Sequence, residues 1–184
     1  MHLDFHTHQL KRDAIVNIDP TEVGDDWHPQ EGYTYSVGIH PWNTATYTAA
    51  DIERLERLAA LPEVVAIGEA GLDTVHQPAA PVEEQVRLLE HHIALSERAE
   101  KPLILHVVKR WDEIIALRKR IKPRQLWVIH GFRGKPQLAR QLLAAGFGLS
   151  YGLKYNPEAY EITPPERRFR ETDEDGGLKA TSVK

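Results

Sequence analysis

The chain has 184 residues, a net charge of −4, a hydrophobic fraction of 41% and no cysteine. This length suits one domain with a sizeable core rather than two. Without cysteine there can be no disulfide and no thiolate ligand, so any metal must be held by nitrogen and oxygen. No apolar stretch approaches the roughly 20 residues needed to cross a bilayer, and the N-terminus does not resemble a signal peptide. We therefore expect a cytoplasmic protein with no membrane partner.

Short apolar runs bounded by turn residues recur along the chain and predict eight strands. These strands are expected near residues 3–8, 14–19, 33–39, 64–69, 102–108, 126–131, 146–151 and 167–172. Helical periodicity predicts helices at 51–61, 81–101, 111–121 and 136–145, whereas the connections at 9–13 and 20–32 hold no convincing helix. Strands that alternate with helices in this way favour parallel βα units.

The fold class that we predict is α/β, a TIM-type (β/α)8 barrel. The barrel must be reduced, because a complete one usually needs about 250 residues. Residues 1–173 form the predicted barrel, which lacks its final helix, and residues 174–184 form a predicted disordered tail of mostly small or polar residues.

The eighth predicted strand alternates arginine with other residues. Arg168 and Arg170 are expected on a solvated outer face, whereas Phe169 and Glu171 point inward, and Asp173 shares their face by the strand period of two. Because no helix is predicted to follow, this strand would leave an uncovered apolar seam. We expect low stability or a homodimer joined through the seam, since large exposed apolar patches mark interfaces.

Residues of metal-ligand type stand at the ends of most predicted strands. They are His6, His8, His40, Glu69, His106, His130 and Asp173. The carboxyl ends of the strands are where a βα barrel builds its active site. Taken singly, each histidine could be a satisfied buried residue, Glu69 a salt-bridged carboxylate and Asp173 a turn cap. Together, at matching strand ends, they predict a metal site.

Five other histidines lack this context: His2, His28, His76, His91 and His92. We expect His91 and His92 to be exposed or half-buried on a helix. His76 lies in a loop that could reach the mouth of the site.

The basic residues are concentrated in one segment. Between Lys109 and Arg140 there are ten basic and two acidic residues, so this segment carries +8 and the remainder −12. Such a region can attract a phosphate-rich partner, although a solvated helix face explains the bases at 118–122 equally well. Lys109, Arg133 and Lys135 are better phosphate-binding candidates, because each lies within five residues of a candidate ligand histidine.

Six motifs in order give the chain a resemblance to a known family. They are Asp4–His8 (DFHTH), Gly38–Trp42 (GIHPW), Ala66–Asp73 (AIGEAGLD), Pro102–His106 (PLILH), Val128–Phe132 (VIHGF) and Glu171–Asp173 (ETD). The chain resembles the TatD family of metal-dependent hydrolases, within the amidohydrolase-like TIM-barrel superfamily, and its compact bacterial members most of all.

The resemblance implies a role for each candidate residue. His6 and His8 would hold one divalent ion together with Asp173. Glu69 would bridge to a second ion held by His106 and His130, and His40 would face the substrate phosphate. Imidazole and carboxylate ligands suit Zn or Mn, whereas the family resemblance points to Mg. The cofactor that we expect is therefore two divalent ions of one of these metals.

The predicted function is a deoxyribonuclease that cleaves DNA phosphodiesters with a hydroxide shared by two metal ions. Its catalytic residues would be Asp173, as general base, with Glu69 and His40. An amidohydrolase-like enzyme acting on a C–N or ester bond stays open, as does a PHP-type phosphomonoesterase. An inactive truncated copy also stays open, because Arg170 replaces an apolar residue of the family and the family's closing helix is missing.

Overall fold

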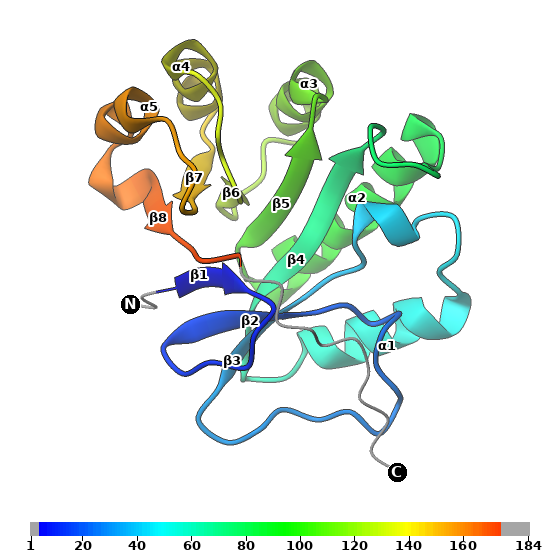
Figure 1. Cartoon of the computed structure of the whole chain (residues 1–184). Coiled ribbons are helices and arrows are strands. Elements are labelled where there is room, and N and C mark those ends of the chain that lie inside the picture. The colour runs from blue at the N-terminus through cyan, green and yellow to red at the C-terminus, as the bar shows by residue number, and fades with distance from the viewer. Residues whose placement is uncertain (1–3, 174–184) are drawn as a thin grey trace.

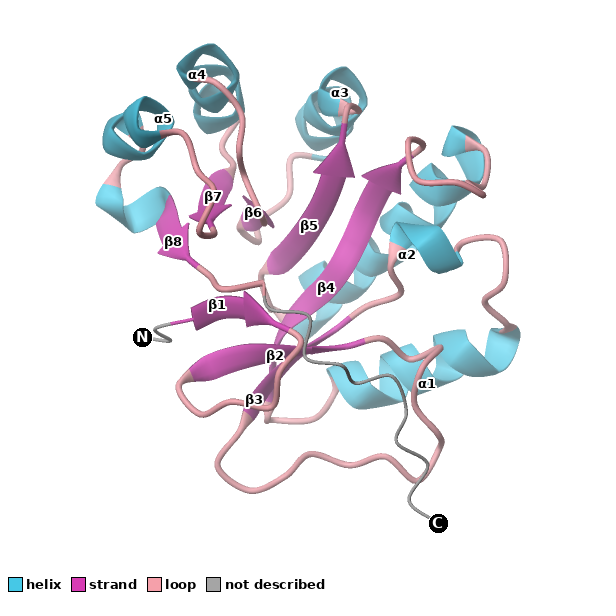
Figure 2. Cartoon of the chain, in the orientation of Figure 1, coloured by secondary structure: helices cyan, strands magenta, loops and turns pink. Residues whose placement is uncertain are grey.

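Within residues 4–173, which the computed structural model describes, eight parallel strands pair in chain order and curl into a nearly closed barrel (Figures 1 and 2). They are β1 Asp4–Thr7, β2 Ala14–Ile18, β3 Thr34–Val37, β4 Val64–Asp73, β5 Leu103–Val108, β6 Trp127–Ile129, β7 Gly148–Tyr151 and β8 Arg168–Arg170. The predicted barrel and its eight strands are confirmed. However, β4 continues to Asp73 instead of ending at Glu69.

The helices cover the barrel from β3 onward, one in each connection. They are α1 Ala49–Ala59, α2 Val82–Ala99, α3 Trp111–Ile121, α4 Pro136–Ala144 and α5 Pro157–Ile162, with single 3₁₀ turns at η1 Pro41–Asn43 and η2 Pro165–Arg167. The first two connections hold no helix, as predicted. In the described part of the chain no helix is long and apolar enough to cross a bilayer.

Two helix starts differ from the sequence prediction. Helix α1 begins before the predicted residue 51: Thr48 is its N-cap, and Asp51 closes a capping box from the third helical position. Helix α5 was not predicted, although Asn156 caps it by accepting a hydrogen bond from the Ala159 N–H at 3.0 Å, with Pro157 at the first position. Both differences concern short polar sequences, where capping outweighs apolar periodicity.

A small apolar layer fills the barrel interior. It consists of Phe5, Ile15, Ala66, Ile104 and Val128, with Phe169 packed against it. A larger apolar cluster lies mainly between the strands and the helices. The side chains of this layer pack against one another and fill the barrel, and the site lies beyond them at the carboxyl ends of the strands.

Two irregular stretches aim ligand residues at this end of the barrel. In β1, Asp4 pairs with Ala14 of β2 and Thr7 pairs with Val16, so β1 contains one extra residue between these pairs. In the same way, β4 contains one extra residue relative to β5 between Ile67 and Ala70. An extra residue in one strand redirects the side chains that follow it. His6 and Glu69 both lie within these stretches. The irregular stretch in β4 requires glycine at position 68. Its φ is +124°, and a Cβ there would collide with a backbone carbonyl of β5.

Hydrogen bonds join the residues after the last strand to the first strand. The Asp4 carboxylate accepts hydrogen bonds from the Thr172 N–H at 3.0 Å and the Thr172 hydroxyl at 2.6 Å. The Asp173 N–H donates to the His6 carbonyl at 3.0 Å. These bonds hold the end of the chain's last described segment against β1, and they fix Asp173 beside His6.

The outer face of β8 is packed rather than simply solvated. The Arg168 guanidinium lies 4.4 Å from the centre of the Tyr160 ring, and that of Arg170 lies 4.9 Å from the Tyr155 ring. Phe169 points inward, 4.3 Å from the Phe5 ring, as predicted. The predicted solvated outer face is confirmed for Arg170, which is exposed, whereas Arg168 is half-buried, and cation–π stacking covers both side chains in part. The predicted tail and missing final helix lie outside the described residues.

Candidate metal centre

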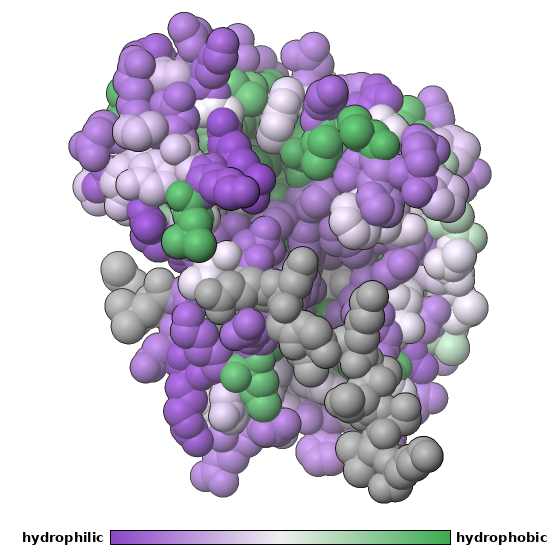
Figure 3. Space-filling model, viewed as in Figure 1, coloured by the Kyte–Doolittle hydropathy of each residue, from purple (hydrophilic) through white to green (hydrophobic). Residues whose placement is uncertain are grey.

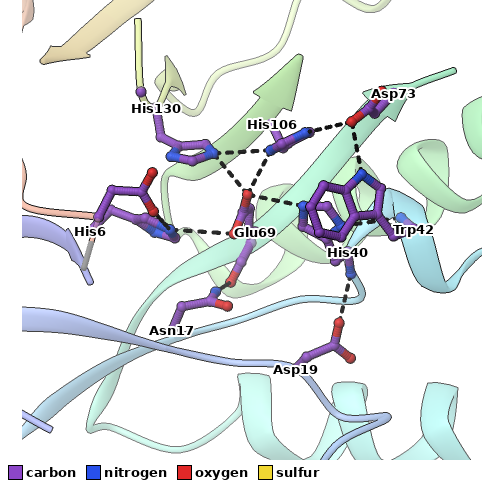
Figure 4. Close-up of polar contacts among 12 residues, drawn as sticks. His6, Asn17, Asp19, His40, Trp42, Glu69, Asp73, His106 and His130 are labelled. Atoms are coloured by element: carbon purple, nitrogen blue, oxygen red, sulfur yellow. Dashed lines mark hydrogen bonds and ion pairs between the residues drawn. The ribbon is translucent and has the colours of Figure 1, made fainter. Parts of the chain in front are cut away.

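Glu69 lies at the centre of a group of histidines at the carboxyl end of the barrel (Figure 4). Its Oε1 atom lies 2.8 Å from His130 Nε2, 2.9 Å from His106 Nδ1 and 3.2 Å from His40 Nε2. His106 lies in β5, whereas His130 follows β6 and His40 follows β3. Residues from three separate strands or strand ends therefore converge on one carboxylate oxygen.

The second carboxylate oxygen of Glu69 faces a different group. Glu69 Oε2 lies 3.3 Å from His6 Nε2 and 3.6 Å from His8 Nε2. The same two nitrogens lie 3.7 and 3.8 Å from Asp173 Oδ1. All seven predicted ligand and catalytic residues are thus brought together, with Glu69 between two groups.

The donor set fits divalent cations. Ligand atoms at the roughly 2.0–2.2 Å typical of zinc lie about 3.3–3.6 Å apart in a tetrahedron. His6 Nε2 and His8 Nε2 lie 3.7 and 3.8 Å from Asp173 Oδ1, close to that separation. The His6 ring is fully buried, yet neither of its nitrogens has a hydrogen-bond partner among residues 4–173. Leaving such an atom unpaired in a protein interior is costly, and a cation beside Nε2 would remove that cost for one nitrogen.

Carboxylates lie beside the far nitrogens of two histidines. His106 Nε2 lies 3.2 Å from Asp73 Oδ2, and His130 Nδ1 lies 3.4 Å from Glu171 Oε1. Metal-binding histidines usually place a carboxylate or carbonyl at the nitrogen that does not face the metal, which sets the tautomer and ring orientation. Here Asp73 and Glu171 are so placed, which leaves the opposite nitrogens of His106 and His130 aimed at Glu69.

His40 differs from the other histidines. Its Nδ1 accepts the Trp42 N–H at 3.1 Å, so the neutral ring carries its proton on Nε2 and donates toward Glu69. Burial lowers the pKa of His40, which favours this neutral form. The Asp19 carboxylate accepts the His40 backbone N–H at 2.9 Å and fixes the loop. His40 is therefore placed as a hydrogen-bond donor rather than as an electron-pair donor.

Charge at the centre is concentrated on Glu69 and His130. Burial raises the pKa of Glu69, but the charge of His130 and hydrogen bonds from His106, His130 and His40 outweigh it and lower that pKa well below its usual range. Burial lowers the pKa of His130, but Glu69 and Glu171 outweigh it and raise that pKa well above its usual range. Glu69 and His130 therefore each favour the charged form of the other.

The predicted basic residues are placed unequally. Arg133 lines a small cavity of about 150 Å³ together with Glu171 and Asp173. Lys154, which the sequence analysis overlooked, lines the same cavity. Lys109 and Lys135 do not line it; they are exposed, after β5 and at the start of α4. Figure 3 shows a largely hydrophilic face with small separated hydrophobic groups.

Three further residues at the site escaped the sequence analysis. Asp73 was missed because β4 was ended too early; with the strand continued, its period of two puts Asp73 on the face of Glu69. Asn17 donates to the Gly68 carbonyl at 2.8 Å and supports the irregular stretch before Glu69. His92, expected to be exposed or half-buried, is fully buried, and its Nε2 accepts the Ile39 N–H at 2.9 Å. No sequence pattern distinguishes these two from ordinary polar residues.

A barrel of eight parallel strands, with one carboxylate set among histidines at its carboxyl end, defines a TIM-type barrel with a site suited to divalent cations. Comparison with known proteins gives the family. The family described as TatD related DNase matches residues 22–174, and the chain belongs to it. The His6 and His8 pair precedes the matched range.

Individual relatives agree with this assignment. The chain is 27% identical over 176 residues to the "uncharacterized metal-dependent hydrolase YabD" of Bacillus subtilis, covering 90% of this chain and 69% of the relative. It is 32% identical over 152 residues to the "uncharacterized metal-dependent hydrolase YcfH" of Escherichia coli, covering 78% and 56%. It is 29% identical over 159 residues to the "3'-5' ssDNA/RNA exonuclease TatD" of a Pantoea species, covering 80% and 60%.

A solved structure has the same fold. The crystal structure of YjjV, a TatD homologue from Escherichia coli, superimposes with a TM-score of 0.72 at 24% identity. The match covers 87% of this chain and 66% of that one. The chain thus spans between 56% and 69% of the length of the relatives named here.

Proposed function

We propose that this chain is a divalent-metal-dependent hydrolase that cleaves phosphodiesters of nucleic acid, with DNA as its substrate. The observation that carries the proposal is Glu69, a buried carboxylate whose two oxygens face two groups of ligand-type side chains. Membership of the TatD related DNase family supports metal-dependent hydrolysis. The name of the Pantoea relative supports nucleic acid as the substrate.

The geometry suggests which residues hold the metal. We assign His6, His8 and Asp173 to one ion, His106 and His130 to a second, and Glu69 to both. The nitrogen and oxygen donors suit Zn or Mn and are compatible with Mg. Bound divalent ions would polarise a phosphate oxygen and lower the pKa of a water molecule.

The surrounding side chains complete the proposed site. The Asp173 side chain is 30% exposed and faces the cavity, so it can accept a proton from an attacking water. The Nε2–H of His40 can donate a hydrogen bond to a phosphate oxygen instead of to Glu69. Arg133 and Lys154 line the cavity beside Asp173 and offer positive charge to the substrate backbone.

A metal-reconstituted assay panel tests this function. We expect hydrolysis of single-stranded DNA that needs metal, stops on chelation and weakens as salt rises, because phosphate contacts release counterions. The panel also contains double-stranded DNA, RNA and activated ester and amide substrates. If only the ester or amide is cleaved, the amidohydrolase-like alternative replaces this proposal. If metal binds and nothing is cleaved, the chain is an inactive copy.

Arg133→Ala should weaken DNA binding rather than turnover. We expect KM to rise, kcat to change little and the slope of log KM against log salt to fall by about one, as for loss of one phosphate contact. Arg140→Ala is the matched control, because Arg140 is exposed on α4 beside Glu158. An equal effect of the two substitutions would mean that Arg133 acts only through overall charge.

Asp73→Asn should weaken metal binding without removing a proposed ligand. A neutral amide oxygen accepts a weaker hydrogen bond from His106 Nε2–H than a carboxylate does. The orientation and basicity of the His106 ring should therefore change. We expect a loss of about 10- to 100-fold in affinity for one ion, measured by competition with a coloured chelator. Unchanged affinity for both ions would show that Asp73 does not orient His106.

Two further statements stay predictions. A cytoplasmic location calls for fractionation of the native host, and a homodimer through the β8 seam calls for sedimentation velocity of the full chain. Stacking of Arg168 and Arg170 on tyrosines reduces the apolar surface available for such a seam.

A further inference from the structure

An aromatic pair stands exposed beside the metal centre. Trp42, in the 3₁₀ turn η1 that follows His40, is 47% exposed. Its ring lies parallel to that of His76, with centroids 3.7 Å apart and an angle of 15° between the planes. The indole also meets two rings edge-on: His40, with centroids 4.6 Å apart, and His106, with centroids 5.9 Å apart. The pair therefore continues the site outward from Glu69 through His40 to solvent.

The indole is held in place by a buried carboxylate. Trp42 Nε1–H donates to Asp73 Oδ2 at 2.8 Å, as Figure 4 shows. Asp73 Oδ1 also accepts the backbone N–H groups of Val75 and His76 at 2.9 and 3.1 Å. One carboxylate thus fixes both the edge of the indole and the loop that carries the second ring. Such prior ordering lowers the entropy cost of binding a ligand.

Positive charge lies against the same loop. The Arg110 guanidinium donates twice to the Thr74 hydroxyl, at 2.9 and 2.7 Å, and it is paired with Glu113 at 2.8 Å. The exposed Lys109 precedes it. Aromatic rings beside cationic side chains are the combination by which proteins hold single-stranded nucleic acid, because bases stack on the rings while phosphates meet the charge.

We propose that Trp42 and His76 form a stacking subsite for a nucleobase of single-stranded nucleic acid. The proposal rests on the function proposed above, since the base would belong to a nucleotide adjoining the phosphodiester held at Glu69. The indole adjoins His40, so a base stacked on the pair lies next to the phosphate-facing side of the centre. A base within a duplex is already stacked and paired, so the subsite favours single strands and accepts any base.

The test compares two substrates that share the same phosphodiesters. One is an eight-residue oligothymidylate, and the other is the same chain with every base removed. For the metal-loaded full chain we expect KM to be about tenfold lower for the oligothymidylate. Trp42→Leu should abolish this difference by raising KM for the oligothymidylate alone. Trp42→Phe, which keeps a stacking face and loses the N–H, should retain most of it.

Controls separate stacking from other effects. Tyr47→Leu removes another exposed aromatic side chain away from the centre and should behave as wild type. His76→Ala should lose part of the base dependence. If Trp42→Leu raises KM for both substrates equally, the indole acts only through Asp73 and the subsite is refuted. A wild-type chain that treats the two substrates alike refutes it as well.

A binding measurement keeps the subsite testable if nothing is hydrolysed. Fluorescence anisotropy of labelled oligothymidylate and its base-free counterpart is measured with Asp173→Asn, alone and combined with Trp42→Leu. Base-dependent binding that is lost with Trp42 supports the subsite even if the proposed hydrolysis fails. Base-independent binding, or no binding, overturns the subsite even if hydrolysis is observed with the wild-type chain.

Discussion

Glu69→Gln will lower the rate of hydrolysis by about 10³-fold or more and disturb the binding of both proposed ions. Glutamine keeps the shape of the side chain but removes its charge and replaces one acceptor oxygen by an NH₂ donor. Because each oxygen faces a separate group of ligand-type residues, either orientation of the amide leaves one group facing a donor. A defect in both metal positions from one substitution is what a shared carboxylate predicts.

Elemental analysis and calorimetric titration of reconstituted protein measure this effect. Wild type should bind up to two divalent ions per chain, and chelation should lower its melting temperature, because a ligand specific to the folded state stabilises that state. Glu83→Gln, an exposed carboxylate on α2, is the matched control. An unchanged metal stoichiometry in Glu69→Gln would count decisively against a shared carboxylate at Glu69.

The sequence was sufficient for the fold and for most of the proposed site because both follow from one pattern. Apolar runs mark buried strands, and in a parallel barrel their carboxyl ends meet at one place. His106, His130 and Glu69 could therefore be expected to converge before any coordinates were known. The strand period led us to expect His6 and His8 on one side of the chain, and both rings do face Glu69, although the backbone of β1 is irregular between Asp4 and Thr7.

The residues that the sequence did not reveal are those defined by tertiary contacts. Asp73 lies on β4 only because the strand runs past Glu69, and a Gly-Glu-Ala-Gly run gives no sign of where pairing with β5 ends. Asn17 acts through a backbone carbonyl on a distant strand. The stacking of Arg168 depends on helix α5, a six-residue helix whose cap signal is easily overlooked.

His92 is the clearest case, and its burial predicts an acid-sensitive fold. Its Nε2 accepts the buried Ile39 N–H at 2.9 Å, while its Nδ1–H donates to the Leu88 carbonyl at 2.8 Å. The ring must be neutral to make both bonds. Burial lowers the pKa of His92 from 6.5 to about 4. The unfolded chain therefore takes up this proton at higher pH than the folded chain does.

The sign of the pH dependence follows from that difference. Between pH 6.5 and pH 4 the unfolded state is protonated at His92 while the folded state is not. The free energy of unfolding therefore decreases as the pH is lowered through this range. The full loss from this residue is about 3 kcal/mol. His92→Gln offers an acceptor oxygen near the position of Nε2 but cannot be protonated. It should be somewhat less stable than wild type at pH 7.5 and lose less stability on acidification.

Urea unfolding of wild type, His92→Gln and His92→Leu at several pH values between 7.5 and 4 measures this. The stability of wild type relative to His92→Gln should fall by about 3 kcal/mol across the series, enough to reverse their order, while His28→Gln, at an exposed histidine, should track wild type. His92→Leu leaves the Ile39 N–H without an acceptor and should cost about 1–3 kcal/mol at pH 7.5. Contributions from residues other than His92 are common to all variants and cancel in the differences. A wild-type advantage that stays constant down to pH 4 would mean that His92 is not held neutral, and that Ile39, and with it the backbone leading to His40, is positioned by other contacts.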